Sequence, residues 1–118
     1  MNAPVEITFT TATDGTVTAY GRAVAGLVYA VQLVDGDLAD GVDITLTVEN
    51  EDLSMPVLVK ADFNTDQMVY PRTLEHLDTS GANLTTHTMP LVYGRPKVVI
   101  AQGGAVKSGS VKLYIVDP

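Results

Sequence analysis

Apolar and polar residues alternate with a period of two over several segments, and this alternation is typical of strands that bury one face. Segment 42–49 (VDITLTVE) is the clearest case, because every apolar residue in it is followed by a polar one. Segments 5–10 (VEITFT) and 111–116 (VKLYIV) show a similar alternation. Successive side chains of a strand point to opposite faces, so each segment is expected to place one set of apolar residues in a core.

Two further segments are apolar almost throughout, namely 24–34 (VAGLVYAVQLV) and 96–102 (PKVVIAQ). Such segments are typical of central strands covered on both faces, or of strands with one face in an intermolecular contact. Shorter strands are predicted at 57–61 and at 16–20. The strand at 16–20 is expected to follow the strand at 5–11 through an Asp-Gly turn of the kind found in hairpins.

Asp-Gly, Ser-Gly and Gly-Gly pairs separate the predicted strands and mark turns. The commonest residue types are Val and Thr, whose β-branched side chains favour strands over helices. Seven or eight short strands with such turns between them predict an all-β fold, an antiparallel β-sandwich of jelly-roll type. The chain is expected to form a single domain, 1–118, in which residues 1–12 are either an N-terminal arm or an edge strand.

Residues 62–95 lack this regular pattern and are rich in Asn, Asp, Pro and Gly. We expect a long irregular excursion there, with short strands at Met68–Tyr70 and Leu84–Thr88. Segment 72–78 (RTLEHLD) is the best candidate for a helix, of one or two turns. Long loops of this kind commonly carry contacts to a partner.

Composition narrows the classes of function. Hydrophobic residues make up 46% of the chain and charged residues 18%, which is typical of a folded domain. The absence of cysteine excludes disulfides, thiolate metal sites and a cysteine nucleophile. A net charge of −7 argues against a nucleic-acid partner, which needs a basic surface. We find no signal-peptide pattern and no apolar segment of bilayer-spanning length, so no membrane partner is expected.

Charge is unevenly distributed along the chain. Residues 1–59 contain one basic and nine acidic residues, whereas basic residues prevail from Tyr93 onward. Two interpretations stay open. The two halves mix in the folded sandwich and their charges cancel, or the acidic stretch Asp35–Asp43 meets a basic region of a neighbouring copy or of an assembly partner.

A search for catalytic and metal-binding patterns finds none that is specific. The aspartates of 35–43 lack the spacing of a calcium loop, so a solvated acidic turn is expected there, with a cation site as the alternative. His76 and His87 are too few for a zinc site, and the Gly-rich segment 103–110 lacks the order of a phosphate loop. We therefore expect no catalytic residues, no cofactor and no metal, and a protein that is not an enzyme.

Several features follow one another in an order that extends from residue 16 to the end. They are TVTAY at 16–20, the apolar segment 24–34, DITLT at 43–47, Tyr70-Pro71-Arg72, and the block KVVIAQGGxxKSGSxxxYIV at 97–116. In this order they resemble a family of small proteins encoded in the structural-gene modules of tailed bacteriophages. The resemblance implies a virion structural protein that is made in the bacterial host cytoplasm. Some β-sandwich proteins of these modules are capsid decoration, or cement, proteins.

The expected function is therefore a capsid decoration protein on the exterior of the phage head, which stabilises the shell by bridging major capsid proteins. The expected partners are the major capsid protein and the chain itself, as a homotrimer rather than a dimer. A head–tail connector, neck or tail component is the first alternative. A module that binds a host-surface glycan or receptor through a concave aromatic site is the second.

Residues for these contacts are chosen by type and position, since Tyr and Arg are favoured at the centres of interfaces. The residues expected to contact the capsid are Tyr70, Arg72, His76, Tyr93 and Arg95. Self-association is expected along the apolar segment 24–34. The residues expected there are Leu27, Tyr29 and Val31.

Overall fold

The computed structural model describes residues 4–49, 54–76 and 83–116. This part of the chain is all-β and antiparallel, with no helix, which confirms the predicted fold class. The strands are β1 (Val5–Thr10), β2 (Val17–Tyr20), β3 (Val24–Val34), β4 (Asp43–Glu49), β5 (Ser54–Lys60), β6 (Gln67–Val69), β7 (Thr73–His76), β8 (Asn83–Thr88), β9 (Leu91–Ala101) and β10 (Ser108–Val116).

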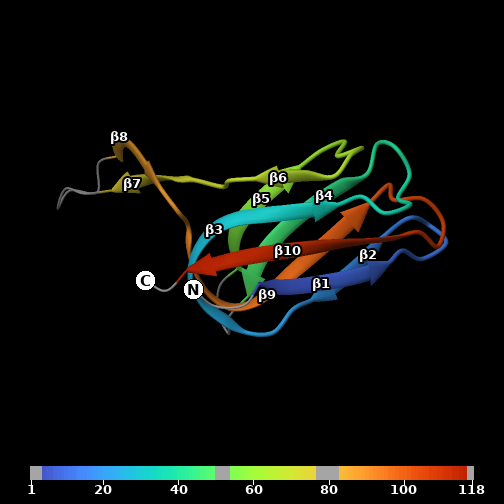
Figure 1. The fold of residues 1–118 in the computed structure, drawn as a ribbon, viewed down its shortest axis with the longest axis horizontal. Helices are drawn as coiled ribbons and strands as arrows, with labels where there is room; N and C mark the ends of the chain where they lie inside the picture. The colour runs from blue at the N-terminus through green and yellow to red at the C-terminus, as the bar shows by residue number, and fades with distance from the viewer. Residues whose placement is uncertain (1–3, 50–53, 77–82, 117–118) are drawn as a thin grey trace.

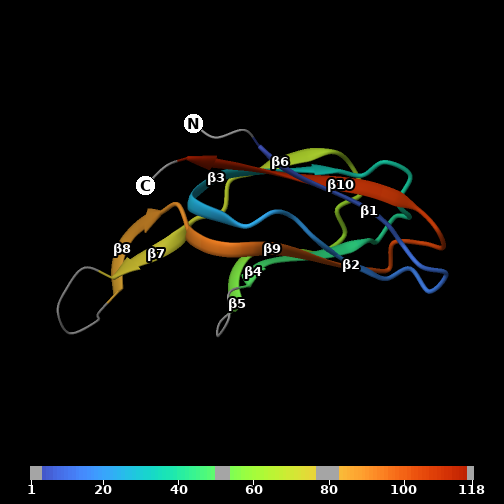
Figure 2. The same cartoon turned by 90° about the horizontal axis from the view of Figure 1, so that it is seen from below.

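Four pairs of strands are nested within one another: β1 with β10, β2 with β9, β3 with β6, and β4 with β5. β10 also pairs with β3, and β9 also pairs with β4. The result is two layers, β1-β10-β3-β6 and β2-β9-β4-β5, which lie face to face in Figure 2.

One strand, β9, belongs to both layers. Its first residues, Leu91–Gly94, pair with β3, whereas the following residues pair with β2 and β4. Gly26 of β3 faces this crossing with a φ of 151°, and a Cβ built there would lie 2.6 Å from the carbonyl oxygen of Val116. Glycine is therefore required where the chain passes this close to β10.

The core fills the space between the layers, and the alternating segments supply most of it. Segments 5–10, 42–49 and 111–116 bury their apolar residues and turn their polar residues outward, as predicted. Phe63, from the loop between β5 and β6, is also fully buried, and its amide donates to the Val42 carbonyl at 3.1 Å. No periodic pattern surrounds Phe63, so the sequence did not identify it as a core residue.

Two expectations about local structure are wrong. A turn does follow β1, with the Gly15 amide 3.0 Å from the Ala12 carbonyl, but β1 and β2 enter different layers and form no hairpin. Within segment 72–78, Thr73–His76 forms strand β7 rather than a helix, while residues 77 and 78 lie outside the described residues. A helix of one or two turns is unstable without packing, whereas β7 satisfies its backbone by pairing with β8.

The stretch 62–95 is more regular than expected, because it holds β6, β7, β8 and the start of β9. β7 and β8 form a separate two-stranded sheet, which we call the β7–β8 hairpin. Figures 1 and 2 show it projecting from one end of the two layers. It contributes to the elongated shape of the molecule, whose extents are 49 × 27 × 26 Å.

Val31 provides a test of the core. Its side chain is 0% exposed, and replacing it with Ala removes two methyl groups from a packed site. We expect Val31→Ala to lower the free energy of unfolding by about 2 kcal/mol, measured by urea denaturation. Thr18→Ala, at an exposed position of β2, is the control and is expected to change it by less than about 0.5 kcal/mol. Equal effects of the two variants would contradict this packing.

Candidate functional site: two exposed apolar surfaces

Among the described residues, no three His, Asp or Glu side chains converge as a metal site would require. The same residues include no helix that could cross a membrane.

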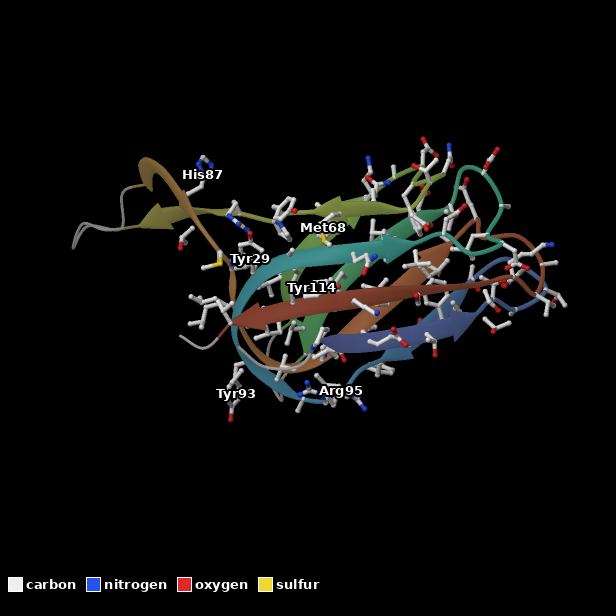
Figure 3. All side chains as sticks on the ribbon, in the orientation of Figure 1. Tyr29, Met68, His87, Tyr93, Arg95 and Tyr114 are labelled. Atoms are coloured by element: carbon white, nitrogen blue, oxygen red, sulfur yellow. The ribbon has the colours of Figure 1, made fainter. Side chains whose placement is uncertain are left out.

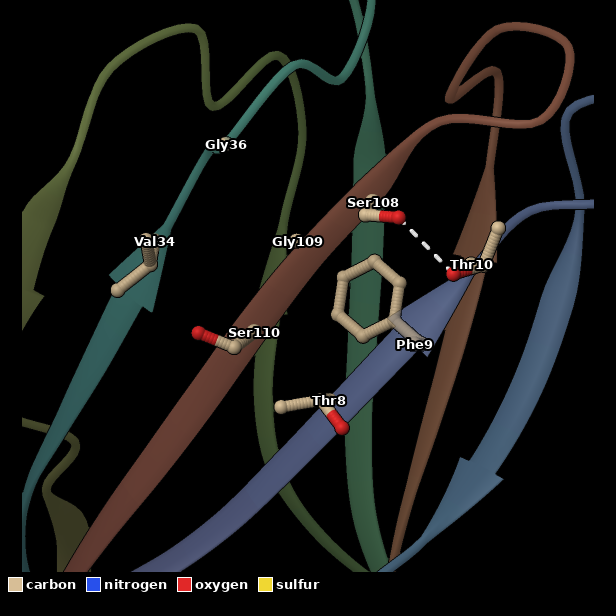
Figure 4. Close-up of a pocket in the computed structure, with 8 residues that line it drawn as sticks. All are labelled: Thr8, Phe9, Thr10, Val34, Gly36, Ser108, Gly109 and Ser110. Carbon is tan, nitrogen blue, oxygen red and sulfur yellow. Dashed lines mark hydrogen bonds between the residues drawn. The ribbon is translucent and has the colours of Figure 1, made fainter.

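A hollow of 490 Å³ lies between β1, β10 and the end of β3, and Figure 4 shows its lining. Its polar groups are the hydroxyls of Thr8, Thr10, Ser108 and Ser110, and the Thr10 and Ser108 hydroxyls are 2.9 Å apart. It contains no ionisable side chain.

The first exposed apolar surface is a groove on the outer side of the β1-β10-β3-β6 layer. It has a volume of 250 Å³ and is lined by Tyr29, Ala30, Met68, Tyr70 and Tyr114, which we call the tyrosine groove. Figure 3 shows Tyr29, Met68 and Tyr114 from three neighbouring strands at this place. Three of the five tyrosines of the chain meet here.

A β-bulge in β3 creates the groove. Val28 pairs with Ile115 and Ala30 pairs with Tyr114, so Tyr29 is an extra residue with no partner across the ladder. A bulge shifts the alternation of side chains by one residue. Tyr29 and Ala30 therefore both line the outer groove, while Val28 and Val31 on either side of them are buried in the core.

The walls of the groove are held by specific contacts. The Tyr29 and Tyr70 rings meet edge to face, with centroids 5.8 Å apart and planes at 83°. Arg72 lies 5.8 Å from the centre of the Tyr29 ring, and its Nη1 donates to the carbonyls of Tyr29 (3.0 Å) and Pro71 (2.6 Å). The Tyr114 hydroxyl lies 3.1 Å from Gln32 Oε1, to which it donates.

Arg72 keeps donors free at the edge of the groove. Its two carbonyl contacts both use Nη1, and no described residue accepts from its other nitrogens. A guanidinium fixed in this way presents Nε and Nη2 as a planar fork, which fits a carboxylate. The groove therefore combines an aromatic lining with one oriented positive charge.

The second surface, which we call the end patch, lies where β9 begins beside β3. Antiparallel pairing sets Leu91 opposite Leu27 and Tyr93 opposite Ala25. Leu91 is 63% exposed and Tyr93 is 68% exposed, which is high for large apolar side chains. A hollow of 300 Å³ next to Tyr93 is lined by Ala23, Val24, Ala25 and Gly94. Contiguous exposed apolar residues of this kind commonly mark a site of interaction.

Arg95 lies on a third surface, the outer side of the β2-β9-β4-β5 layer. Its guanidinium is 4.0 Å from the centre of the Tyr20 ring. Nearby, Lys97 forms a 3.0 Å salt bridge with Glu49, and the hydrogen bond to Glu49 raises the pKa of Lys97. Lys97 thus has a charged partner, whereas Arg72 has none among the described residues.

The residues expected to contact the capsid and those expected to mediate self-association therefore do not form two separate groups in the structure. Tyr29 joins Tyr70 and Arg72 in the tyrosine groove, and Leu27 joins Tyr93 in the end patch. Val31 is a core residue, so its predicted place in a self-association surface does not fit the structure. His76 ends β7 of the projecting hairpin, and its side chain lies outside what the structure describes.

Sequence reasoning missed Tyr114, Met68 and Leu91. Tyr114 could have been found, because in segment 111–116 it stands at an outward position of the alternation. Met68 and Leu91 lie in the stretch that was expected to be irregular, where no pattern indicates which way a side chain faces.

Aspartates gather in the loops at the other end of the layers, which we call the acidic end. They are Asp14, Asp35, Asp37, Asp40, Asp43, Asp62 and Asp66. Hydrogen bonds tie these loops together, among them Ala39 N to Gly103 O (3.0 Å) and Gly103 N to Gly15 O (2.9 Å). Lys60 and Lys107 are the cations in the same region. Five of the nine acidic residues of the first half thus belong to the acidic end instead of being mixed evenly along it.

Several carboxylates of the acidic end accept hydrogen bonds from loop amides. Asp37 accepts from Ser108 N at 2.6 Å, and Asp66 accepts from Asp35 N at 2.8 Å. Asp43 accepts from Asp62 N at 3.1 Å. These aspartates shape the turns, which is a structural reason for their number.

Asp35 makes stability depend on pH. Burial raises the pKa of Asp35 above its usual 3.8, and the charges of Asp66, Asp40 and Asp37 raise it further. The folded chain then binds more protons than the unfolded chain in this range, so stability falls as pH rises through the window from 3.8 to the raised pKa. We expect Asp35→Asn to raise Tm at pH 7, with a gain that vanishes below that window.

Asp14 offers a matched variant, for which the expected change in Tm at pH 7 has the opposite sign. Hydrogen bonds from the Thr16 hydroxyl (2.8 Å) and amide (3.1 Å) lower the pKa of Asp14. Asp14→Asn should therefore lower Tm at pH 7, and the loss should disappear as pH falls through the lowered pKa. Thermal melts of both variants and the parent from pH 3 to 7 measure this, and shifts of the same sign would contradict it.

No family model matches the chain, and neither a curated protein nor a solved structure matches it.

Proposed function

We propose that this chain is a structural protein of a tailed-bacteriophage virion, and that it decorates the outside of the head by bridging neighbouring major capsid proteins. The observation that carries the proposal is the end patch, where Leu91 and Tyr93 are exposed directly after the β7–β8 hairpin. An uncovered apolar surface beside a projecting hairpin supports docking on a larger partner.

The end patch and the β7–β8 hairpin are both needed for a stable contact. A specific interface buries roughly 800 Å² on each partner, while one aromatic side chain supplies roughly 150–250 Å². The end patch therefore serves as the centre of the contact, and the β7–β8 hairpin adds area around it. An isolated two-stranded sheet is marginally stable in water, so a partner along the hairpin would also stabilise it.

The terminal block at 97–116 supports the phage assignment through its resemblance to proteins of phage structural-gene modules. In the structure this block forms the second part of β9 and all of β10, which are central strands of the two layers. A head–tail connector or tail component uses the same kind of surface. Labelled imaging of virions separates the two roles, since an even coat over the head supports decoration and a signal at one vertex supports the connector.

A second candidate is the binding of a host-surface glycan, and the tyrosine groove is the observation that favours it. Tyr29, Tyr70 and Tyr114 surround a 250 Å³ hollow, and sugars commonly stack on aromatic rings. Glycan-array binding that is lost in Tyr29→Ala would support this candidate. A silent array would leave the capsid as the partner to be preferred.

The test of the decoration role uses undecorated capsids of the phage that encodes the chain. We expect the purified protein to bind them and to raise their melting temperature. The double variant Leu91→Thr/Tyr93→Ala should bind at least about 30-fold more weakly, since it removes two central apolar contacts. Cosedimentation and calorimetry of the capsids measure both effects.

Val59→Thr is the control, because Val59 is 73% exposed but lies on β5, away from the end patch. It is expected to bind as the parent does. Absence of binding by the parent protein would refute the decoration role, and equal binding by the double variant would refute the end patch as its surface.

A further inference from the structure

Val106 has an unusual conformation in the loop between β9 and β10. Its φ is 52°, although a β-branched residue strongly disfavours positive φ, and its side chain is 61% exposed. The fold gains little packing from this largely exposed valine and bears the cost of its backbone strain. Strained residues that face solvent commonly mark functional sites.

Thr11 holds this loop in place. The buried Thr11 hydroxyl donates to Gly104 O at 2.6 Å and accepts from Lys107 N at 2.9 Å, and Thr11 N donates to Lys107 O at 2.8 Å. Val106 N also donates to Ala12 O at 3.3 Å. Val106 is thus a fixed apolar knob instead of a mobile side chain at the tip of a loop.

Two loops that carry aspartates lie next to the loop of the knob. The loop that carries Val106 bonds to the loops that carry Asp14 and Asp40, through Gly103 N to Gly15 O and Ala39 N to Gly103 O. Asp40 makes no hydrogen bond or salt bridge within the described residues, and its side chain is exposed. The acidic end therefore presents an exposed valine and, on a neighbouring loop, an exposed carboxylate without a partner among the described residues.

The tyrosine groove is complementary to this surface. It is an apolar hollow of 250 Å³, and beside it Nε and Nη2 of Arg72 donate to no described residue. Knob and groove lie at opposite ends of β10, since Val106 precedes the strand and Tyr114 is near its end. The distance from Ser108 to Tyr114 along a strand is about 20 Å, so the knob of one molecule does not reach its own groove.

We propose that the occupant of the tyrosine groove is a second copy of this chain, with Val106 of one copy in the groove of the next and Asp40 paired with Arg72. The two surfaces are different patches of one chain, so the contact is heterologous and repeats from copy to copy. A heterologous contact forms a ring when its rotation closes and a filament when it does not, and the homotrimer expected from the sequence is one such ring. This inference is independent of the capsid role.

The first test uses purified protein alone in sedimentation-velocity experiments over a range of concentrations. Val106→Gly removes the knob and also relieves the positive φ, so the variant should fold with an equal or higher Tm. We expect its self-association constant to fall at least tenfold, since burial of a valine side chain is lost. Val59→Thr, which removes an exposed valine elsewhere, should associate as the parent does.

The second test exchanges the charges of the proposed pair. Arg72→Glu should weaken self-association, and the combined variant Arg72→Glu/Asp40→Arg should restore most of it, because the pair is re-formed with opposite polarity. Arg95→Glu, which changes a cation on the other layer, is the control. Added salt should weaken the association of the parent.

Three results would overturn the proposal: a parent protein that is monomeric at its highest soluble concentration, a Val106→Gly variant that associates like the parent, or failure of the charge exchange to restore association. A glycan that binds the groove of the monomeric protein would assign the groove to that ligand instead. Because no capsid is present in these experiments, their failure leaves the decoration role to be decided by the capsid-binding test.

Discussion

β9 pairs with β3 at its start and with β2 and β4 further on, and the two layers are joined through this shared strand. The chain has no cysteine, so packing and hydrogen bonds hold the layers together without a disulfide. The crossing brings the backbones of β3 and β10 so close that position 26 has no room for a side chain. It also leaves the outward residues at the start of β9 without a covering layer. The end patch is therefore a direct product of the crossing.

The strands and the direction of their side chains were predicted best where one face of a strand is buried. Segment 42–49 reads correctly because Ile44, Leu46 and Val48 all face the core and their neighbours all face outward. The strands of the stretch 62–95 could not be predicted from such an alternation. β6 is only three residues long and pairs with β3 over a distance of more than thirty residues, and such pairing leaves no local pattern. Segment 72–76 has a spacing that also fits a helix, and pairing with β8 decided the outcome.

The prediction for Val31 failed for a reason that is specific to β3. With strict alternation Leu27, Tyr29 and Val31 would share one face of the strand. The bulge at Tyr29 adds one residue, so Leu27 and Tyr29 stay outside and Val31 turns into the core. The same bulge brings Tyr29 to Tyr70, a residue forty positions away that was assigned a different role. A bulge is not visible in hydrophobic periodicity, so neither result could be foreseen.

The nesting of the strand pairs also bears on how the chain folds. β4 and β5 form the innermost pair and are close in sequence, whereas β1 and β10 form the outermost pair and lie at opposite ends of the chain. Pairs with large sequence separation form late, because closing a long loop costs more entropy than closing a short one. We therefore expect folding to proceed outward from β4 and β5. During synthesis the edge strand β1 stays unpaired until the ribosome has released β10. The order of translation therefore delays the pairing of β1 with β10, which is the last step of folding.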